Sequence, residues 1–421
     1  MTKHRWLNLL CLAEVGTMLV LLNYSAVLPV IQAEWGLSNT QAGLIYSAYQ
    51  IGYILLVVVL STLTDYMDAK KIYVYSALWA GVAGIIFALF ANGFYSALIL
   101  RCLTGFGLAG TYMPGLKMVT AKFSEGERGR AVGLYVGAFS FGTALSMFLT
   151  GALTGAFHWR AAMFITSLGP LFGALLAWRI LEPVIPAADG PAGFAQVRTD
   201  VLDNRPALLM IVGYMAHMWE MFGMRGWIVA FFTAALMARE TALSQATSFG
   251  AVLSSLIILA GAFSTAWAGA LSDRFGRART VQVIMLGSAA CSLIFGWLRP
   301  WPVLLLLLFS LGYGFLVTAE SSVLSTAVTE FVPFRCLGSA MAIQSFLGWA
   351  AAGISPAVFG LVLDMTNSAQ TVERMGYIPN WGPAFAVLGV GALAGPLAMS
   401  FVKREMAKRK GAIPCSSLDT D

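Results

Sequence analysis

Ionisable side chains lie inside several apolar stretches of this 421-residue chain. A charge held in hydrocarbon costs several kcal/mol unless it faces water or a partner, so such residues mark internal polar sites by default. Acids and bases in these positions can bind a charged solute or carry a proton. The three acids and three bases, with a nearby histidine, suggest one polar cavity. These candidate substrate-binding and proton-coupling residues are Glu14, Arg101, Lys117, His217, Glu220, Arg225 and Glu320.

Glu220 is the strongest candidate for proton coupling or substrate contact. It lies near the middle of an apolar stretch at 207–236, and His217 lies one turn earlier on a similar helix face. Loss of water disfavours the charged form of a carboxylate, so a buried Glu220 would bind a proton readily. The alternative for Glu220 is a fixed charge paired with a neighbouring base. A histidine such as His217, taken alone, is more often a hydrogen-bonded residue of the helix core.

Helix geometry limits which of these charges can share a cavity. Arg101 and Lys117 would point about 160° apart on a regular helix, so both face one cavity only if a bend near Pro114 reorients one of them. Glu220 and Arg225 would point about 140° apart, so one of the two would brace a neighbouring helix.

The two remaining acids depend on depth. Glu14 and Glu320 lie in the parts of their apolar stretches that are expected nearer the cytoplasm. Either acid would meet Arg101 or Lys117 only if the side chains lie at the same depth in the membrane. Arg101 itself has two interpretations, proton handling or bracing of helices.

Composition indicates the elements that must position these residues. Hydrophobic residues make up 58% of the chain and charged residues 11%, and the mean hydropathy is +0.77. Soluble domains carry about 25% charged residues, so this chain is predicted to be embedded in a membrane. Spanning helices need about 20 apolar residues. Twelve such helices are predicted near 6–30, 41–63, 72–90, 95–120, 130–154, 161–181, 207–236, 247–270, 280–298, 301–328, 337–363 and 382–402.

The distribution of basic residues predicts the orientation. With the amino terminus inside, most of the 26 Lys and Arg residues fall in cytoplasmic segments, which satisfies the positive-inside rule. Both termini are therefore expected in the cytoplasm, and the net charge of +6 needs no nucleic-acid partner. The basic stretch 403–410 would contact anionic membrane lipids. The opposite side holds only Arg160, Arg239, Arg299 and Arg374.

A break in the apolar pattern divides the chain in the middle. Pro183, Pro186 and Pro191 interrupt regular structure there. We expect an N-terminal six-helix bundle at 1–182, a cytoplasmic linker at 183–206, a C-terminal six-helix bundle at 207–402 and a cytoplasmic tail at 403–421.

The two predicted bundles repeat each other in sequence. Asp65 and Asp273 occupy similar positions in the loops after the second and eighth spans, and Gly105 and Gly107 match Gly312 and Gly314 at nearly the same offset. Landmarks that recur at one offset imply parallel structural repeats about an axis along the membrane normal.

The loop after the eighth span carries the most specific motif. The pattern Gly269-x-Leu271-x-Asp273-Arg274-x-Gly276-Arg277-x-Arg279 resembles the loop signature of the major facilitator superfamily of secondary transporters. Arg101-x-x-x-Gly105, the segment 127–130 and the pair Trp159-Arg160 are similar to further motifs of that family. The resemblance implies an all-α membrane protein with 12 transmembrane helices in two pseudo-symmetric six-helix bundles. It also implies a monomer whose bundles rock about a central site, surrounded by 6–30, 95–120, 207–236 and 301–328.

The signature loop predicts a conformational latch. A carboxylate near a helix amino terminus gains about 0.3–1 kcal/mol from the helix dipole when exposed. Asp273 with Arg274 and Arg277 would form a contact between the halves that holds one face shut. The N-terminal copy keeps Asp65 but lacks the bases, which leaves its latch incomplete. The alternative is a basic loop that only fixes the topology.

Glycines and aromatic residues have plainer interpretations. Gly105, Gly107, Gly110, Gly115, Gly133 and Gly137 are expected to permit close helix contact. The aromatic residues that could line a site, although helix packing is the commoner use, are Tyr46, Tyr49, Tyr53, Trp219 and Trp349.

No motif names a substrate. The signatures of nitrate carriers, of many drug antiporters and of sugar carriers are absent from the sequence. No phosphate-binding loop or catalytic constellation indicates an enzyme or a cofactor, and the five cysteines have no spacing typical of a disulfide framework or a metal site.

We predict a secondary active transporter in the bacterial inner (plasma) membrane. It would move a small polar or anionic organic solute by alternating access, coupled to protons, and the intramembrane bases favour an anion. The alternatives are an efflux carrier for amphipathic compounds, favoured by 19 Met residues and many aromatics, and a sensor or scaffold that has lost transport.

Overall fold

The computed structural model describes residues 2–64, 66–182, 198–333 and 336–411. Within these ranges the chain is helical and contains no strand, and twelve helical spans are long and apolar enough to cross a membrane. The predicted all-α fold with twelve transmembrane helices is confirmed. Residues 183–197 of the predicted linker at 183–206 lie outside the described residues, and its remaining part contains a short π-helix, η1 (Arg198–Leu202), and the start of the next helix at Arg205.

Eight helices precede the linker. They are α1 (Lys3–Met18), α2 (Asn23–Trp35), α3 (Asn39–Leu63), α4 (Ala69–Phe90), α5 (Phe94–Ala109), α6 (Tyr112–Lys122), α7 (Glu125–Ala156) and α8 (Trp159–Ile180). The second set contains α10 (Arg205–Met237), α11 (Leu243–Phe275), α12 (Arg277–Phe295), the 3-10 turn η2 (Gly296–Leu298), α13 (Val303–Phe331), α14 (Leu337–Thr366), α15 (Ala369–Met375), α16 (Gly382–Ala392) and α17 (Ala394–Gly411).

Three predicted spans each consist of two helices rather than one. The span at 6–30 is broken between α1 and α2, 95–120 between α5 and α6, and 382–402 between α16 and α17. Irregular backbone at membrane depth survives only where protein groups satisfy its polar atoms. At the first break the hydroxyl of Ser146 donates to the carbonyl oxygen of Leu19 at 2.6 Å and accepts from the backbone N–H of Leu22 at 3.3 Å.

Local sequence explains where several helices begin. A capping box starts α3, because the hydroxyl of Ser38 accepts from the backbone N–H of Gln41 and the Gln41 side chain accepts from the N–H of Ser38. Gly276 separates α11 from α12 with φ at 85°, a conformation that glycine adopts without strain.

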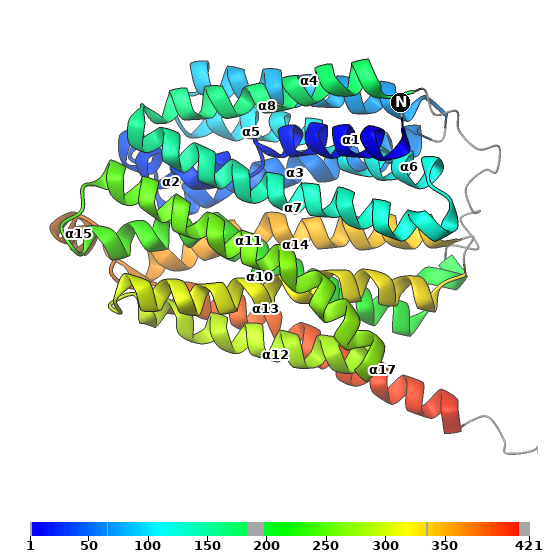
Figure 1. Ribbon diagram of the computed structural model, residues 1–421. Helices are drawn as coiled ribbons and strands as arrows, with labels where there is room; N and C mark the ends of the chain where they lie inside the picture. The colour runs from blue at the N-terminus through cyan, green and yellow to red at the C-terminus, as the bar shows by residue number, and fades with distance from the viewer. Residues whose placement is uncertain (1, 65, 183–197, 334–335, 412–421) are drawn as a thin grey trace, which may run out of the picture.

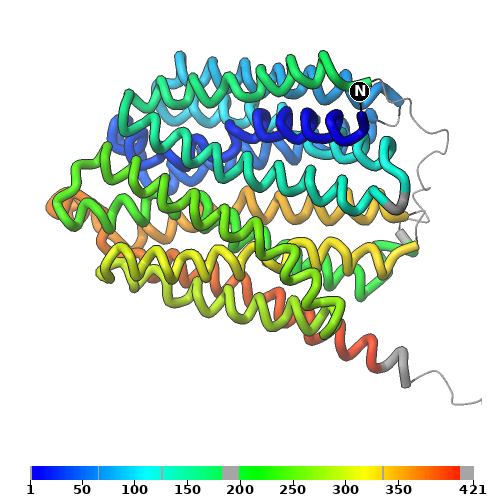
Figure 2. The backbone as a smooth tube through the Cα atoms, in the orientation of Figure 1, coloured from blue at the N-terminus to red at the C-terminus, as the bar shows by residue number. Residues whose placement is uncertain are grey.

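The helices form two groups that lie side by side. Helices α1–α8 lie on one side of the molecule and α10–α17 on the other (Figure 1), and the backbone trace shows the same division (Figure 2). We call these groups the N-terminal and C-terminal halves. They meet where α3 packs on α14 and α7 packs on α11. Contact is close, since a Cβ added at Gly43 would lie 2.3 Å from the carbonyl oxygen of Pro356.

The two ends of the helix bundle differ. One end, which we call the basic end, carries the start of α1 with Lys3, the end of α6 with Lys122 and the start of α12 with Arg277 (Figure 1). The other end, which we call the opposite end, carries α15 and the start of α3.

A strong hydrogen-bonded tie between the halves lies at the opposite end. The carboxylate of Asp364, near the end of α14, accepts from the backbone N–H groups of Asn39 and Thr40 at 3.0 and 2.8 Å. It also accepts from the side chains of the same two residues at 2.8 and 2.6 Å. The N-terminus of α3 is therefore capped by a carboxylate from the other half, a favourable arrangement for the helix dipole.

Candidate functional site

A cavity of about 400 Å³ lies between the two halves. Helices α3, α5, α6 and α7 contribute its N-terminal wall, and α10, α11, α13 and α14 contribute its C-terminal wall. The lining stretches of α13 and α14 belong to the parts of those helices nearer the basic end, so the cavity lies on that side of the tie at Asp364.

Arg225 carries the charge of this cavity. It is the only Asp, Glu, Lys or Arg among the described residues that line it, and it is 6% exposed. Its Nε atom is buried without a hydrogen-bond partner, and its guanidinium forms no ion pair with any described acid. The guanidinium carbon lies 5.8 Å from the ring centroid of Phe222, one turn earlier on α10. An uncompensated guanidinium in a site of this size is ready to receive an anion.

A cluster of three titratable groups lies behind the C-terminal wall. His217 Nδ1 lies 3.2 Å from Glu320 Oε1, and Glu220 Oε2 accepts from the hydroxyl of Ser288 at 2.9 Å. His217, Glu220 and Glu320 are fully buried and do not line the cavity. His217 Nε2, Glu220 Oε1 and Glu320 Oε2 have no hydrogen-bond partner within the described ranges. His217 therefore pairs with Glu320 and not with Glu220, its neighbour along α10.

Glu14 has a different environment in the N-terminal half. Its Oε2 atom accepts from the hydroxyls of Tyr135 at 2.8 Å, Tyr73 at 3.1 Å and Thr17 at 3.3 Å. The side chain is fully buried and does not line the cavity. Tyr135 also donates to the carbonyl oxygen of Tyr112, which is a cavity residue. Glu14 thus holds α1, α4 and α7 together and meets neither Arg101 nor Lys117 in an ion pair among the described residues.

Arg101 braces the break in the first span. Its Nη1 donates to the carbonyl oxygen of Val20 at 3.3 Å and to Asn23 Oδ1 at 3.0 Å, and its Nη2 donates to the carbonyl oxygen of Leu21 at 3.4 Å. The guanidinium also lies 4.6 Å from the ring centroid of Tyr49. These contacts supply donors to carbonyls that leave the helix at the α1–α2 break, so the geometry supports the bracing interpretation.

Lys117, a residue of α6, does not line the cavity and instead contacts the C-terminal end of α3. Its ammonium donates to the carbonyl oxygen of Thr64 at 2.8 Å and to the Thr64 hydroxyl at 3.1 Å. Cations near helix C-termini interact favourably with the helix dipole. The expectation of one chamber shared by all the buried charges is therefore wrong. The structure divides them among the cavity, the C-terminal cluster, the Glu14 site and two helix ends.

The signature loop forms contacts inside the C-terminal half. Arg277 Nη1 lies 2.6 Å from Asp273 Oδ1, and Arg277 Nη2 lies 3.0 Å from Glu330 Oε1 on α13. Arg274 lies over the ring of Phe275 at 5.3 Å. Asp65, the N-terminal counterpart, lies outside the described residues. Arg277 therefore links α11, α12 and α13, which all belong to the C-terminal half. The latch hypothesis requires a contact between the halves, and among the described residues Asp273, Arg274 and Arg277 form none.

The glycine expectation is correct on α5 and wrong on α7. A Cβ at Gly105 would lie 2.0 Å from the carbonyl oxygen of Tyr49, so α5 and α3 touch through this residue. A Cβ at Gly133 or Gly137 would have no neighbouring atom within 4 Å. The glycines of α7 near the basic end therefore do not serve close packing in this conformation.

The aromatic expectations divide in the same way. Tyr53 and Trp349 line the cavity, and their ring centroids are 4.3 Å apart. Tyr46, Tyr49 and Trp219 are not among the described lining residues.

Two helical stripes in the sequence indicated the cavity and were missed. Tyr214, Met218, Met221, Phe222 and Arg225 follow one another at helical spacing on α10, and all five line the cavity. A second stripe, of hydroxyl residues on α13, also lines the cavity. It consists of Thr318, Ser321, Ser322, Ser325 and Thr326. His217 and Glu220 fall between members of the first stripe, so they point into the C-terminal half.

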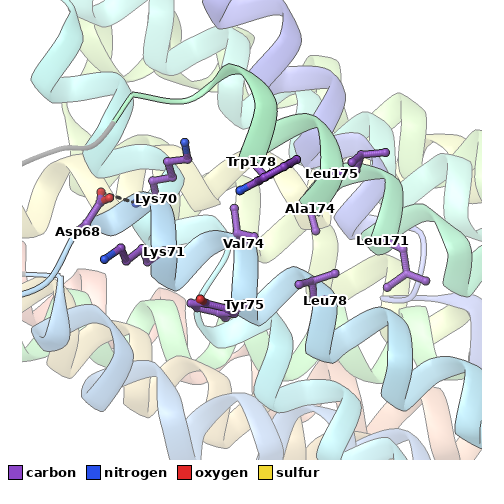
Figure 3. A pocket seen from close by; sticks show the side chains of 10 residues that line it. All are labelled: Asp68, Lys70, Lys71, Val74, Tyr75, Leu78, Leu171, Ala174, Leu175 and Trp178. Carbon is purple, nitrogen blue, oxygen red and sulfur yellow. Dashed lines mark hydrogen bonds between the residues drawn. The ribbon is translucent and has the colours of Figure 1, made fainter.

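A second pocket lies on the outer surface between α4 and α8. Val74, Leu78 and Leu171 form its apolar floor, and Lys70 and Lys71 lie at one end (Figure 3). None of the candidate site residues lines it. Among the described residues, no group of three or more His, Cys, Asp or Glu side chains is placed to hold a metal ion.

Comparison with known proteins agrees with this architecture. Residues 10–356 match the family model described as Major Facilitator Superfamily. A probable sulfoacetate transporter of Cupriavidus necator is 26% identical over 428 residues, which cover 93% of this chain and 93% of the relative. A hexuronate transporter of Bacillus subtilis is 26% identical over 362 residues, 82% of this chain and 84% of the relative.

A solved structure shows the same fold. The crystal structure of a bacterial homolog of the human lysosomal transporter Spinster superimposes with a TM-score of 0.76 at 17% identity, covering 97% of this chain and 99% of the other. The family resemblance of the signature loop is confirmed, and the chain belongs to the Major Facilitator Superfamily of membrane transporters.

Proposed function

We propose that this protein moves a small organic anion across the membrane by alternating access, with proton movement coupled to that of the anion. The observation that carries the proposal is Arg225, the one charged residue among the described residues that line the cavity. The two relatives support it, because sulfoacetate and hexuronates are organic anions.

The chemistry of Arg225 favours a carboxylate or a similar group. A guanidinium presents parallel N–H donors that match the two oxygens of a carboxylate. A buried charge without a partner is costly, and an anion that binds it relieves that cost. The bound anion would therefore stabilise the conformations that enclose Arg225.

The fold offers a route to alternating access. Asp364 ties the halves at the opposite end, while the cavity lies between the middle of the molecule and the basic end. Rocking of one half on the other would break this tie and close the basic end. Such movement about a central site is the mechanism that the two-bundle architecture supports.

Proton coupling is assigned to the cluster of His217, Glu220 and Glu320. Two carboxyl groups lie here in an apolar interior, and no described basic residue forms an ion pair with Glu220. Charged carboxylates without such compensation are costly at membrane depth, so the cluster holds protons that it can release when the interior is hydrated. Glu220 stays the leading proton carrier, and the paired His217 and Glu320 would pass protons to and from it.

The surroundings of the protein follow from the same reasoning. We propose that the basic end faces the cytoplasm of a bacterial inner membrane, with both termini there and the basic residues of α17 against anionic lipids. We expect a monomer, because each chain holds a complete cavity.

A binding assay with a matched pair of variants tests the role of Arg225. Sulfoacetate, glucuronate and benzoate are added separately to detergent-purified protein, and apparent stability is followed by thermal unfolding, since a ligand of the folded state raises it. An anion that stabilises the wild type should lose at least about 30-fold in affinity in Arg225→Gln, which corresponds to about 2 kcal/mol. Arg279→Gln, at an exposed base outside the cavity, is the control. Equal binding by wild type and Arg225→Gln would refute the assignment.

The aromatic and methionine side chains of the walls favour one alternative, an efflux carrier for amphipathic compounds. The direction in which protons move relative to the substrate distinguishes an anion importer from an efflux carrier. An anion importer accumulates its substrate when protons flow inward with it, whereas an exporter expels it in exchange for protons. Uptake into inside-out and right-side-out vesicles, compared under the same pH gradient, gives the direction.

A further inference from the structure

We propose, building on the anion transport proposed above, that the cavity selects a monocarboxylate whose body is a flat aromatic ring or a ring of similar shape and polarity. The proposal concerns the class of anion. It rests on the number of charges in the cavity, on the difference between its two walls and on the rings beside Arg225.

The charge of the cavity matches a single negative charge. Arg225 supplies one guanidinium, and no second base lies among the described lining residues. A second carboxylate on the substrate would be buried without a counter-charge, and that burial is strongly unfavourable. Dicarboxylates are therefore disfavoured relative to monocarboxylates of the same size.

The N-terminal wall is largely apolar and partly aromatic, with Ser140 and the hydroxyls of two tyrosines as its polar groups. Tyr53, Tyr112 and Phe139 contribute rings to it, and Leu108 and Met113 fill the space between them. Tyr112 and Phe139 have ring centroids 4.9 Å apart. A substrate face that meets this wall gives up water and gains few hydrogen bonds, so an apolar face is favoured there.

Most of the polar side chains that line the cavity belong to the C-terminal wall, and several of their hydrogen-bond donors are already in use. The hydroxyl of Ser322 donates to the carbonyl oxygen of Thr265 at 3.0 Å, and that of Thr318 donates to the carbonyl oxygen of Gly314 at 3.0 Å. The amide nitrogen of Gln344 donates to the hydroxyl of Ser325 at 3.1 Å. The hydroxyls of Ser322 and Thr318 can still accept but have already donated their one hydrogen, so a substrate rich in acceptors finds fewer donors on this wall.

The rings beside Arg225 fix where the substrate body would lie. Trp349 contacts Phe222, with centroids 4.9 Å apart, and Tyr53 from the other half, with centroids 4.3 Å apart. Phe222 also lies next to the guanidinium of Arg225. A carboxylate bound to Arg225 therefore directs the attached body toward these three rings. Flat rings stack well on such a surface, whereas a body with a hydroxyl on every carbon would bury hydroxyls without partners.

Four probes of different chemistry test the class. Benzoate is an aromatic monocarboxylate, phthalate adds a second carboxylate to the same ring, gluconate is a polyhydroxylated monocarboxylate, and benzyl alcohol is the ring without the charge. Binding to the purified full-length protein is measured by thermal unfolding and by titration calorimetry. We expect benzoate to bind at least about 10-fold more tightly than each of the other three, in line with one unpaired polar or charged group.

A ring variant makes the test specific to the stacking surface. Phe222→Leu keeps an apolar side chain beside Arg225 but removes the ring. It should weaken benzoate about 3- to 10-fold, the range expected for an aromatic contact. The same variant should leave the affinity for gluconate within about twofold.

The outcomes separate this inference from the proposed function. Tighter binding of phthalate or gluconate than of benzoate, in a manner that needs Arg225, overturns the class and leaves anion transport standing. Equal benzoate affinity in wild type and Phe222→Leu also overturns the class. Tight binding of benzyl alcohol, unaffected by Arg225→Gln, overturns both. No stabilisation by benzoate at saturation overturns the class, whatever the other probes do.

Discussion

Glu14 and Glu220 are both fully buried acids on the first span of their halves, yet their surroundings differ. Glu14 accepts three hydrogen bonds, from the hydroxyls of Thr17 on its own helix, Tyr73 on α4 and Tyr135 on α7. Glu220 accepts from Ser288 with one oxygen and leaves the other without a partner among the described residues. Burial on the first span of a half therefore does not determine the role of an acid. Its partners decide whether it holds the structure or exchanges a proton.

The same contrast extends to the two buried arginines. Arg101 in the N-terminal half donates from its guanidinium to backbone carbonyls, whereas the guanidinium of Arg225 in the C-terminal half lines the cavity and forms no ion pair with a described acid. We propose that the N-terminal half supplies shape and support, and that the C-terminal half supplies the charge of the cavity and the groups that carry protons.

The largest effect is expected from neutralising Glu14 and Glu220 in turn. Glu220→Gln should abolish accumulation of the anion driven by a pH gradient while leaving exchange of anion for anion, because exchange needs no net proton movement. Glu14→Gln should retain gradient-driven accumulation, since an amide oxygen still accepts from Tyr73 and Tyr135. Both fluxes are measured in proteoliposomes with the anion that the binding screen identifies. Loss of accumulation in Glu14→Gln with normal accumulation in Glu220→Gln would reverse the comparison.

A smaller effect is expected when the two arginines are compared by stability alone. Arg101→Lys should lower the free energy of unfolding by about 1–3 kcal/mol, because one ammonium cannot reproduce the fan of donors to Val20, Leu21 and Asn23. Arg225→Lys should change it by less than about 1 kcal/mol in the absence of ligand. Thermal unfolding of the purified variants without added anion gives both values. If Arg225→Lys is the less stable protein, Arg225 is structural and the division of labour fails.

The tie between the halves provides a test with a still smaller effect. Asp364→Asn keeps the shape of the side chain but removes the charge that faces the N-terminus of α3. A carboxylate in such a partly buried position contributes up to about 2 kcal/mol, so the population opened at the opposite end should rise by at most about 30-fold. Spin labels at the exposed positions Ala33 and Met365, in a background without native cysteines, report the separation of the halves. An unchanged distance distribution in Asp364→Asn would show that the apolar contacts of α3 with α14 hold this end closed.

The sequence predicted the helices well because apolar length and basic loops are local signals. Gly105 was interpreted correctly as a point of close helix contact. The break at Leu19–Leu22 was not predictable, because the groups that satisfy it, Ser146 and Arg101, come from other helices.

The candidate site was predicted only in part, and the reason is geometric. Burial in an apolar stretch identified Arg225, Glu220 and Glu14, but it could not tell a cavity wall from a helix core. The stripe from Tyr214 to Arg225 would have separated the cavity face of α10 from the face that carries His217 and Glu220. Asp364 escaped notice because it lies at the end of a span, where a carboxylate is unremarkable until its partners on α3 are known.

The smallest effect is expected at the basic end, where the halves have unequal ion pairs. Arg277 joins Asp273 and Glu330 in the C-terminal half, whereas the N-terminal half has an exposed pair of Lys122 and Glu182 with 2.7 Å between Nζ and Oε2. The hydrogen bond and charge of Lys122 lower the pKa of Glu182 below its ordinary value. A lowered pKa in the folded state adds stability above the pKa of the unfolded chain, and this contribution is lost as the pH falls through the folded value.

Because the Glu182 carboxyl is exposed, solvent screens the Lys122–Glu182 pair and its contribution is small. Glu182→Gln should therefore unfold at the same temperature as the wild type at neutral pH, within error, and the two proteins should stay indistinguishable near pH ~4 as well. Arg277→Gln, measured beside it, should lower the unfolding temperature at neutral pH, since it frees two carboxylates that converge on one guanidinium. If Glu182→Gln lowers the unfolding temperature more than Arg277→Gln does, the stronger ion pair at the basic end belongs to the N-terminal half. The assignment of charge to the C-terminal half would then apply only to the cavity and to the cluster of His217, Glu220 and Glu320.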